Sequence, residues 1–354
     1  MPTGLSMAWG VLFMIDAIAV GGESSEPVQG FFDKLKPMGR ILNLMADGWT
    51  VWGCAPIYDE NGKIHLFFAR WQQGGNWKKI DWMNSGQIVH AMADCPEGPY
   101  DVLEVVLKGR GHDYWDGTGV INPQIYKFDG KYVLLYTGIN TKSTRKIQAI
   151  GMAVADTLNG PWKIISDREP LVTISNYKEQ FDSILCNNPA LLKAPDGKFY
   201  LYYKGRSILY EQQNQRICRR IGLAVAEKLE GPYVKHPDNP FLDHSPKDYE
   251  DPYVWYEDSL FKMILHDLSY IEHGTGLYLE STDGKKWSKP VKGYPSTKSA
   301  FGVKQRLETP ILLMRDGHPQ YLFNNRGGSE KEKVFSRFVW KIENTNKPDS
   351  SDDL

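Results

Sequence analysis

The chain has 354 residues, 42 of them Lys or Arg and 43 Asp or Glu, which gives a formal net charge of −1. This near-neutral balance excludes the strongly basic class of nucleic-acid-binding and membrane-surface proteins, so we expect neither partner. No stretch of about 20 uncharged apolar residues marks a membrane span, and the length fits two ordinary domains or one large all-β domain.

Residues 1–30 are expected to form an N-terminal lead. The stretch "MAWGVLFMIDAIAVGGESSE" contains a short apolar run followed by small residues, as secretion signals do, but it lacks a basic start and carries Asp16. It is therefore typical of a degraded signal segment. The sequence leaves open whether the protein is secreted or periplasmic, or stays in the cytoplasm.

An internal repeat follows along the chain. Each copy has a proline, an apolar run, a turn with Asp or Gly and an aromatic-rich second strand: "CAPIYDENGKIHLFFAR", "NPQIYKFDGKYVLLYTG", "NPALLKAPDGKFYLYYKG", "DPYVWYEDSLFKMILHD" and "TPILLMRDGHPQYLFNN". Their prolines are Pro56, Pro123, Pro189, Pro252 and Pro310. A regular period of this length is typical of a propeller or a solenoid.

Each repeat also carries a later strand pattern. "IVHAMADCPEGPY", "AIGMAVADTLNGPW" and "RIGLAVAEKLEGPY" are near copies, "GLYLESTDGKKW" is a looser fourth, and "VFSRFVWKIE" closes the series. The alternation has period two and ends in turn residues, as in half-buried strands. The sequence therefore predicts an all-β fold, a five-bladed β-propeller with four-stranded antiparallel blades over residues 31–345, followed by a disordered acidic tail at 346–354.

The residues before each proline begin the innermost strands, so we expect them at the mouth of a central funnel. The candidates there are Asn122, Asn188, Glu250, Asp251 and Glu308. The ends of the second strands add Arg70, Lys204, His266 and Asn324 at matching offsets, and Asp116 and Asp182 each stand seven residues ahead of a proline. Convergent polar groups of this kind indicate a binding or catalytic pocket.

Structural roles remain alternatives for several of these residues. Asp116 and Asp182 could cap turns or hold blades together, because short Asp side chains favour such bonds. Asp251 could pair with backbone amides, and Glu308 could form an ion pair with Arg306.

The five Pro-led repeats, "EDPYVWYED" and the "GPW/GPY" turns resemble the five-bladed glycoside hydrolases of family 43 and relatives such as family 117, over residues 45–343. The family 43 pattern implies Asp-Pro in blades one and two and Glu-x-Pro in blade three. Here those positions hold Ala55, Asn122 and Asn187, none of which can transfer a proton as the mechanism requires. Residues of the same types stand two blades later, at Asp251 and Glu308.

The resemblance implies a glycoside hydrolase, which we expect to be exo-acting on an oligosaccharide derived from a plant or algal polysaccharide. Two carboxylates would act in the funnel: Glu308 as general acid and Asp182 as base, with Asp116 as the fallback. Glu250 and Asp251 would stand beside Glu308, and His266 would orient Asp251 or supply the proton itself.

For binding, we expect Trp52, Trp71 and Trp115 to stack on sugar rings. Arg70, Lys204 and Arg206 would meet hydroxyl groups, a carboxylate or a sulfate, and the pocket would also use Asn122, Asn188 and Asn324. No cofactor is expected to be required, although a structural calcium or sodium ion in the funnel stays open, as does the oligomeric state. The alternative functions are a non-catalytic carbohydrate-binding propeller and a lyase on uronic-acid glycans that uses Lys204, Arg70 and His266.

Overall fold

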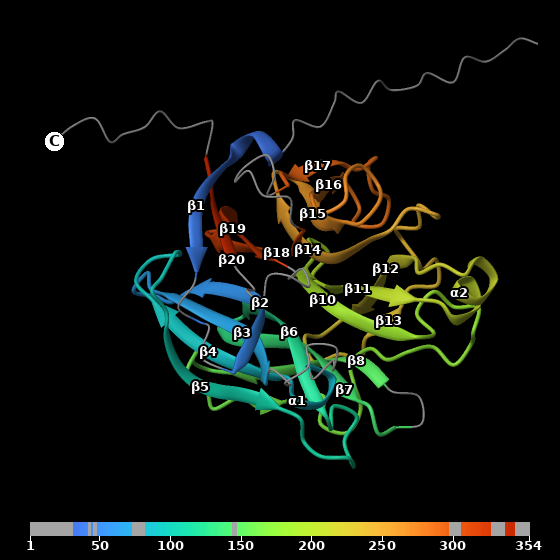
Figure 1. Ribbon diagram of the computed structural model, residues 1–354, viewed down its shortest axis with the longest axis horizontal. Coiled ribbons are helices and arrows are strands. Elements are labelled where there is room, and N and C mark those ends of the chain that lie inside the picture. Colours follow the sequence, from blue (N-terminus) through green and yellow to red (C-terminus); the bar gives the residue numbers. More distant parts are fainter. Residues whose placement is uncertain are drawn as a thin grey trace, which may run out of the picture.

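The structure is a computed structural model that describes residues 31–41, 44, 48–72, 82–143, 147–296, 306–326 and 337–343. These residues form five sheets of four antiparallel strands. The first strands of the sheets surround a common centre (Figure 1). The prediction of a five-bladed β-propeller is confirmed. The expected N-terminal lead and acidic tail lie outside the described residues.

Each blade runs from its inner strand outward. Blade one contains β2 (Trp49–Tyr58), β3 (Ile64–Gln72), β4 (Gln87–Ala93) and β5 (Asp101–Lys108). Blade two contains β6 (Gly119–Phe128), β7 (Lys131–Asn140), β8 (Ile147–Ala155) and β9 (Lys163–Ile164). Blade three contains β10 (Leu185–Lys193), β11 (Phe199–Arg206), β12 (Arg219–Ala226) and β13 (Val234–Lys235).

Blade four contains β14 (Tyr249–Glu257), β15 (Leu260–Asp267), β16 (Gly276–Ser281) and β17 (Val291–Tyr294). Blade five combines β18 (Leu307–Arg315), β19 (His318–Arg326) and β20 (Arg337–Ile342) with β1 (Leu35–Ile41), which comes from the other end of the chain. The strands β1 and β20 pair antiparallel, so the propeller closes through backbone hydrogen bonds. The helical segments are η1 (Phe31–Lys34), α1 (Trp82–Ser85) and α2 (Ile208–Asn214), and no described helix is long and apolar enough to cross a membrane.

Every inner strand is bent by one residue near its start that has a positive φ. In blades two to five this residue directly precedes the repeat proline, and the pairing register shifts there. These residues are Asn122, Asn188, Asp251 and Thr309, with φ between 47° and 60°. Asn and Asp tolerate this conformation better than most residues because their short polar side chains can bond locally.

Blade one corrects the alignment made on the prolines. Its register shift lies between Trp52 and Cys54, and Gly53 has a φ of 57°. A Cβ atom on Gly53 would lie 3.5 Å from Pro123 Cδ, so this glycine packs against the matched segment of blade two. The residue at the axis of blade one is therefore Gly53, two positions before the predicted Ala55. We call Gly53, Asn122, Asn188, Asp251 and Thr309 the axial residues.

Candidate active site

The axial residues are joined by hydrogen bonds that run from blade to blade. Asn122 Nδ2 donates to Asn188 Oδ1 (2.5 Å), and Asn188 Nδ2 donates to Asp251 Oδ1. From the other side, the backbone N–H of Thr309 donates to Asp251 Oδ2 (3.1 Å), and Asn325 Nδ2 donates to the Thr309 hydroxyl. Asp251 therefore has the backbone-amide bond that its structural interpretation required. Both series of hydrogen bonds, the one from Asn122 through Asn188 and the one from Asn325 through Thr309, end at Asp251.

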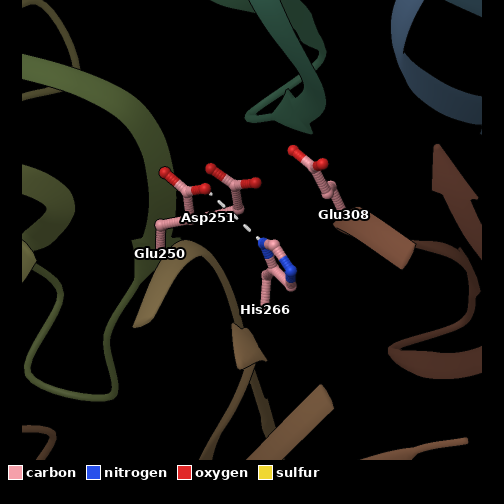
Figure 2. Close-up of side chains that lie close together, drawn as sticks. All are labelled: Glu250, Asp251, His266 and Glu308. Carbon is pink, nitrogen blue, oxygen red and sulfur yellow. Dashed lines mark ion pairs between the residues drawn. The ribbon is translucent and has the colours of Figure 1, made fainter. Parts of the chain in front are cut away.

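Four ionisable side chains converge beside this chain of bonds (Figure 2). Glu250, Asp251, His266 and Glu308 each offer one oxygen or nitrogen atom, and these atoms all lie within 4.8 Å of one another. We call this group the carboxylate cluster. Its members come from β14, β15 and β18, so blades four and five build it together. The cluster brings together four of the six residues predicted to be catalytic.

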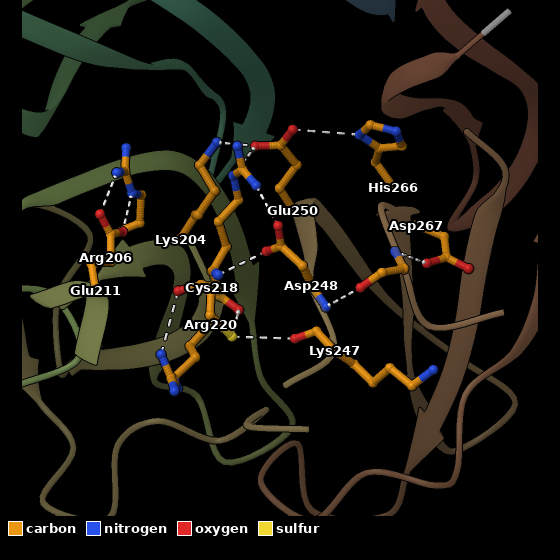
Figure 3. A network of polar contacts seen from close by, with 12 residues as sticks. Lys204, Arg206, Glu211, Cys218, Arg220, Lys247, Asp248, Glu250, His266 and Asp267 are labelled. Atoms are coloured by element: carbon orange, nitrogen blue, oxygen red, sulfur yellow. Dashed lines mark hydrogen bonds and ion pairs between the residues drawn. The ribbon is translucent and has the colours of Figure 1, made fainter. Parts of the chain in front are cut away.

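Glu250 is surrounded by positive charge (Figure 3). Lys204 Nζ lies 2.6 Å and Arg219 Nε 3.0 Å from Glu250 Oε2, and His266 Nδ1 lies 3.5 Å from Glu250 Oε1. Lys204 Nζ also lies 3.6 Å from Asp251 Oδ1. A carboxylate buried to this extent needs such pairing, since an isolated buried charge is very unfavourable. The offsets in the sequence predicted Lys204 and His266, whereas no repeated position marks Arg219, which begins the third strand of blade three.

These charges move neighbouring pKa values in opposite directions. Burial alone would raise the pKa of Glu250, but Lys204, His266 and Arg219 outweigh it and hold that pKa well below its usual range. Burial and then the charge of Glu250 raise the pKa of Asp251 to about 6, although Lys204 and His266 oppose the shift. Burial lowers the pKa of His266, but the surrounding carboxylates more than reverse this and raise it. Two adjacent carboxyl groups with separated pKa values are typical of acid–base sites.

Glu308 reaches the cluster from the second residue of β18. Arg306 Nη2 lies 2.6 Å from Glu308 Oε1, so the ion pair considered from the sequence is present. Across the ladder, Glu308 pairs with Asn325, whereas the sequence offset had pointed to Asn324. In blade one, the residue that pairs with Trp52, directly before the axial Gly53, is Ala69, whereas the sequence offset had pointed to Arg70. Counting from the prolines therefore placed the second-strand residues of blades one and five one position away.

Asp116 and Asp182 do not join the cluster. Both side chains are about 1% exposed, and each accepts a hydrogen bond from a tyrosine hydroxyl and pairs with one cation. The partners are Tyr136 and Arg110 for Asp116, and Tyr203 and Lys235 for Asp182. This is the structural alternative, in which the aspartates hold strands and loops together. The predicted roles of Asp182 as base and Asp116 as fallback lose their geometric basis.

Two of the predicted sugar contacts are occupied elsewhere. The Trp115 side chain is buried in the core, with Nε1 donating to the carbonyl of Ser166 (2.8 Å), so the prediction that it stacks on a sugar is wrong. Arg206 donates twice to Glu211, at 2.6 and 2.7 Å. Trp52 and Trp71 are only half-buried and remain candidates for stacking.

Arg70 also lies to one side of the axis. Its guanidinium covers the Trp49 ring at 4.4 Å from the ring centroid and donates to Gln87 Oε1. Of the three cations predicted to contact substrate, Lys204 alone adjoins the carboxylate cluster.

The carboxylate cluster has a composition that could hold a cation. Three carboxylates and an imidazole can ligate a hard divalent ion, and among the described residues Nε2 of His266 has no hydrogen-bonding partner. Lys204 and Arg219 already supply positive charge to Glu250 in this arrangement.

Solved structures with this architecture are similar over most of the chain. A family 117 glycoside hydrolase from the marine bacterium Zobellia galactanivorans has a TM-score of 0.67 and 17% identity, over 88% of this chain and 91% of that one. A thermostable family 43 glycoside hydrolase has a TM-score of 0.57 and 14% identity, over 84% and 91%. A family 43 enzyme from Xanthomonas citri has a TM-score of 0.52 and 16% identity, over 86% and 90%.

No protein-family model and no curated protein matches the chain. At identities of 14% to 17%, the likeness to solved structures shows the fold. It confirms, at that level, the resemblance to families 43 and 117 drawn from the repeats. The chemistry has to be argued from the side chains at the axis.

Proposed function

We propose that the protein is a glycosidase that hydrolyses a glycosidic bond at the propeller axis. The observation that carries this proposal is the carboxylate cluster, in which one atom from each of three carboxyl groups and a histidine lie within 4.8 Å of one another, where the inner strands β14 and β18 begin. Glycoside hydrolysis needs two carboxyl groups on either side of the bond, one that carries a proton and one that is ionised. Glu250, whose pKa is held well below its usual range, and Asp251, whose pKa is about 6, can both be ionised at neutral pH, so the site can supply the ionised partner.

We assign Glu308 as the general acid and Asp251 as the second carboxylate. Glu308 stands on β18, apart from the other two, and its longer side chain can reach a leaving-group oxygen at the funnel mouth. Asp251 replaces Asp182 in this role because Asp182 is buried against Tyr203 and Lys235. Lys204 and His266 stabilise the ionised form of Asp251 when a substrate excludes water.

The separation of the pair supports retention of anomeric configuration. Retaining enzymes place the two carboxyl groups about 5 Å apart, whereas inverting enzymes leave roughly 6.5–9.5 Å for a water molecule. One oxygen of Glu308 and one oxygen of Asp251 lie within 4.8 Å of each other, which fits the shorter, retaining spacing. Asp251 would then attack the anomeric carbon, and Glu308 would first protonate the leaving oxygen and later deprotonate the incoming water.

We further propose that the enzyme acts from a chain end, on an oligosaccharide of plant or algal origin. The direct bonds between Asn122, Asn188, Asp251 and Thr309 join side chains of adjacent blades across the axis. A polysaccharide therefore has little room to pass through the centre, which favours a saccharide that is bound by its end.

A carbohydrate-binding propeller without catalysis is the second candidate. It is favoured by the axial positions of blades one to three, where Gly53, Asn122 and Asn188 carry no acid. It is also favoured by Asp251, since both of its oxygens accept hydrogen bonds from neighbouring blades.

Reducing-sugar release across a panel of plant and algal oligosaccharides tests the proposal. With an active substrate, Glu308→Gln should lower turnover by orders of magnitude and leave the thermal midpoint nearly unchanged. Glu104→Gln, on the exposed outer strand β5, is the matched control and should behave like the wild type. Tight binding of an oligosaccharide with no release, and equal behaviour of both variants, would favour the binding protein instead.

A further inference from the structure

A second concave site lies between blades one and two. It is a cavity of about 620 Å³, within the range usual for small-molecule sites. Its lining comes from the ends of β3 and β5, the starts of β2 and β4, helix α1 and the loop before β6. We call it the side cavity.

The side cavity opens at the same end of the propeller as the carboxylate cluster. The axial residues contact one another although each is only the third to fifth residue of its inner strand, so the inner strands all begin at one end. Trp49 and Thr118, which line the side cavity, stand at the start of β2 and directly before β6. One sugar chain could therefore extend from the axis toward this cavity along a single face.

The walls of the side cavity are held in place before any ligand binds. In the loop before β6, the N–H of Gly111 donates to the carbonyl of Gly117 (3.0 Å), and a Cβ atom on Gly109 would lie 2.7 Å from that same carbonyl oxygen. Arg110 Nε donates to buried Asp116 (2.7 Å), which anchors the loop from beneath. Asp116 thus has a positioning role for this wall.

The opposite wall is fastened in the same way. The Thr118 hydroxyl donates to the carbonyl of Met83 (2.7 Å), and the Thr141 hydroxyl donates to Asn84 Oδ1 (2.8 Å). These bonds connect helix α1 of blade one to the strand ends of blade two. A cavity with such fixed walls costs little ordering entropy when it is filled.

The chemistry of the lining is cationic and amide-rich. Lys108, Lys142 and His112 line the side cavity together with the amides of Gln72 and Asn84, and none of the described lining residues is an Asp or Glu. Within the part of the chain that the structure describes, neither lysine has an ion-pair partner. This differs from the axis, where Lys204 and Arg219 are matched by Glu250 and Asp248.

We propose that the side cavity binds an anionic sugar residue, a uronate or a sulfate ester, of the saccharide whose end lies at the axis. The inference rests on the proposed glycosidase function for that saccharide. The ammonium groups of Lys108, at the end of β5, and of Lys142, just after β7, would meet a carboxylate or sulfate as charge-assisted hydrogen-bond donors, and the amides would meet ring hydroxyls. Charge recognition, which the sequence assigned to Arg70, Lys204 and Arg206, thus moves to Lys108 and Lys142.

The test is a titration of the full chain carrying Glu308→Gln, so that turnover does not consume the probe. The probes are a sulfated galactan tetrasaccharide, an oligogalacturonate of equal length and a neutral galactan tetrasaccharide. Lys108→Met with Lys142→Met should weaken at least one anionic probe about tenfold or more and reduce the salt dependence of its affinity. The neutral probe should be unaffected. Lys163→Met, an exposed lysine on β9, is the matched control and should change neither affinity.

The response of one anionic probe or of both identifies the group that is recognised, and each of these results supports the proposal. Equal weakening of neutral and anionic probes, no weakening of either, or the failure of both anionic probes to bind overturns it. The readout is binding alone. A protein that binds in this charge-dependent way but releases no sugar refutes the catalytic proposal and leaves the anionic site intact. If turnover depends on Glu308 but the affinity for anionic probes does not depend on Lys108 or Lys142, the catalytic proposal is supported and the anionic site is refuted.

Discussion

The assignment of Asp251 as the ionised partner of Glu308 predicts where activity falls in acid. Asp251 must lose its proton to attack, and its pKa is raised to about 6 by burial and by the charge of Glu250. The acidic limb of the kcat/KM profile, which reports groups of the free enzyme, should therefore lie near pH 6. A carboxyl group without these neighbours would place it near pH 4.

Two substitutions should move this limb in opposite directions. Lys204 Nζ lies 3.6 Å from Asp251 Oδ1, and unit charges about 4 Å apart interact by about 4 kcal/mol at an effective dielectric of about 20. That is an upper bound of about 3 pKa units, and Glu250 shares the same ammonium group, so we expect about one unit. Lys204→Met should raise the Asp251 pKa and move the limb to higher pH. Glu250→Gln removes the negative neighbour and should move it to lower pH.

The assay is initial rate against pH at substrate concentrations well below KM, together with a ¹³C titration of the aspartate carboxyl signals. The carbon titration is needed because His266, Glu250 and Glu308 surround Asp251, and a pH–rate profile alone does not say which group loses the proton. Shifts of the same sign in both variants, or a wild-type limb near pH 4, would refute the role of Asp251.

Three further predictions concern the same machinery. Asp182→Asn leaves Lys235 without its carboxylate and should lower the free energy of unfolding by about 2 kcal/mol, while the folded fraction keeps its turnover. This value is below the range for fully buried pairs because Lys235 is one-third exposed. Lost turnover at unchanged stability would restore Asp182 as a catalytic group. The first product seen by proton NMR should have the anomeric configuration of the substrate, because one oxygen of Glu308 and one oxygen of Asp251 lie within 4.8 Å of each other, and an inverted product would exclude this pair. Dialysis against a chelator should leave turnover unchanged, since the assigned steps need no metal, and recovery of activity only on adding calcium would contradict this.

The fold was predictable because every blade carries the same sequence pattern. Each copy contains an alternating strand, a turn of Asp or Gly and a second strand, so the local pattern alone specifies a hairpin. Five copies with near-constant spacing then leave closure around an axis as the way to bury their faces. Blade five also retains the pattern in β18 and β19, although its outermost strand, β1, comes from the start of the chain.

The site was only partly predictable, because it depends on register and on partners from other blades. Gly53, and not Ala55, reaches the axis because a glycine can adopt the positive φ that Asn or Asp adopts in other blades. In blade one no proline directly follows this residue, so the repeat does not mark it. The same kind of shift separates Asn325 from the predicted Asn324. Arg219 and Lys235 lie dozens of residues from the carboxylates they neutralise, and nothing in the local sequence identifies those pairs.

The equivalence of the five inner strands around one axis explains why Asp251 and Glu308 stand two blades away from the positions of the family 43 pattern. In a propeller of repeated units, adjacent blades can present an Asp and a Glu to the centre at any point on the ring, and here blades four and five do so. The amides of Asn122 and Asn188 then hold Asp251 in place from the side where the family pattern has acids. Blade one, with Gly53 at the axis, adds no side chain to the centre and lies between the cluster and the side cavity. A saccharide bound by its end at blades four and five would therefore have its clearest path over blade one, toward Lys108 and Lys142 of the side cavity.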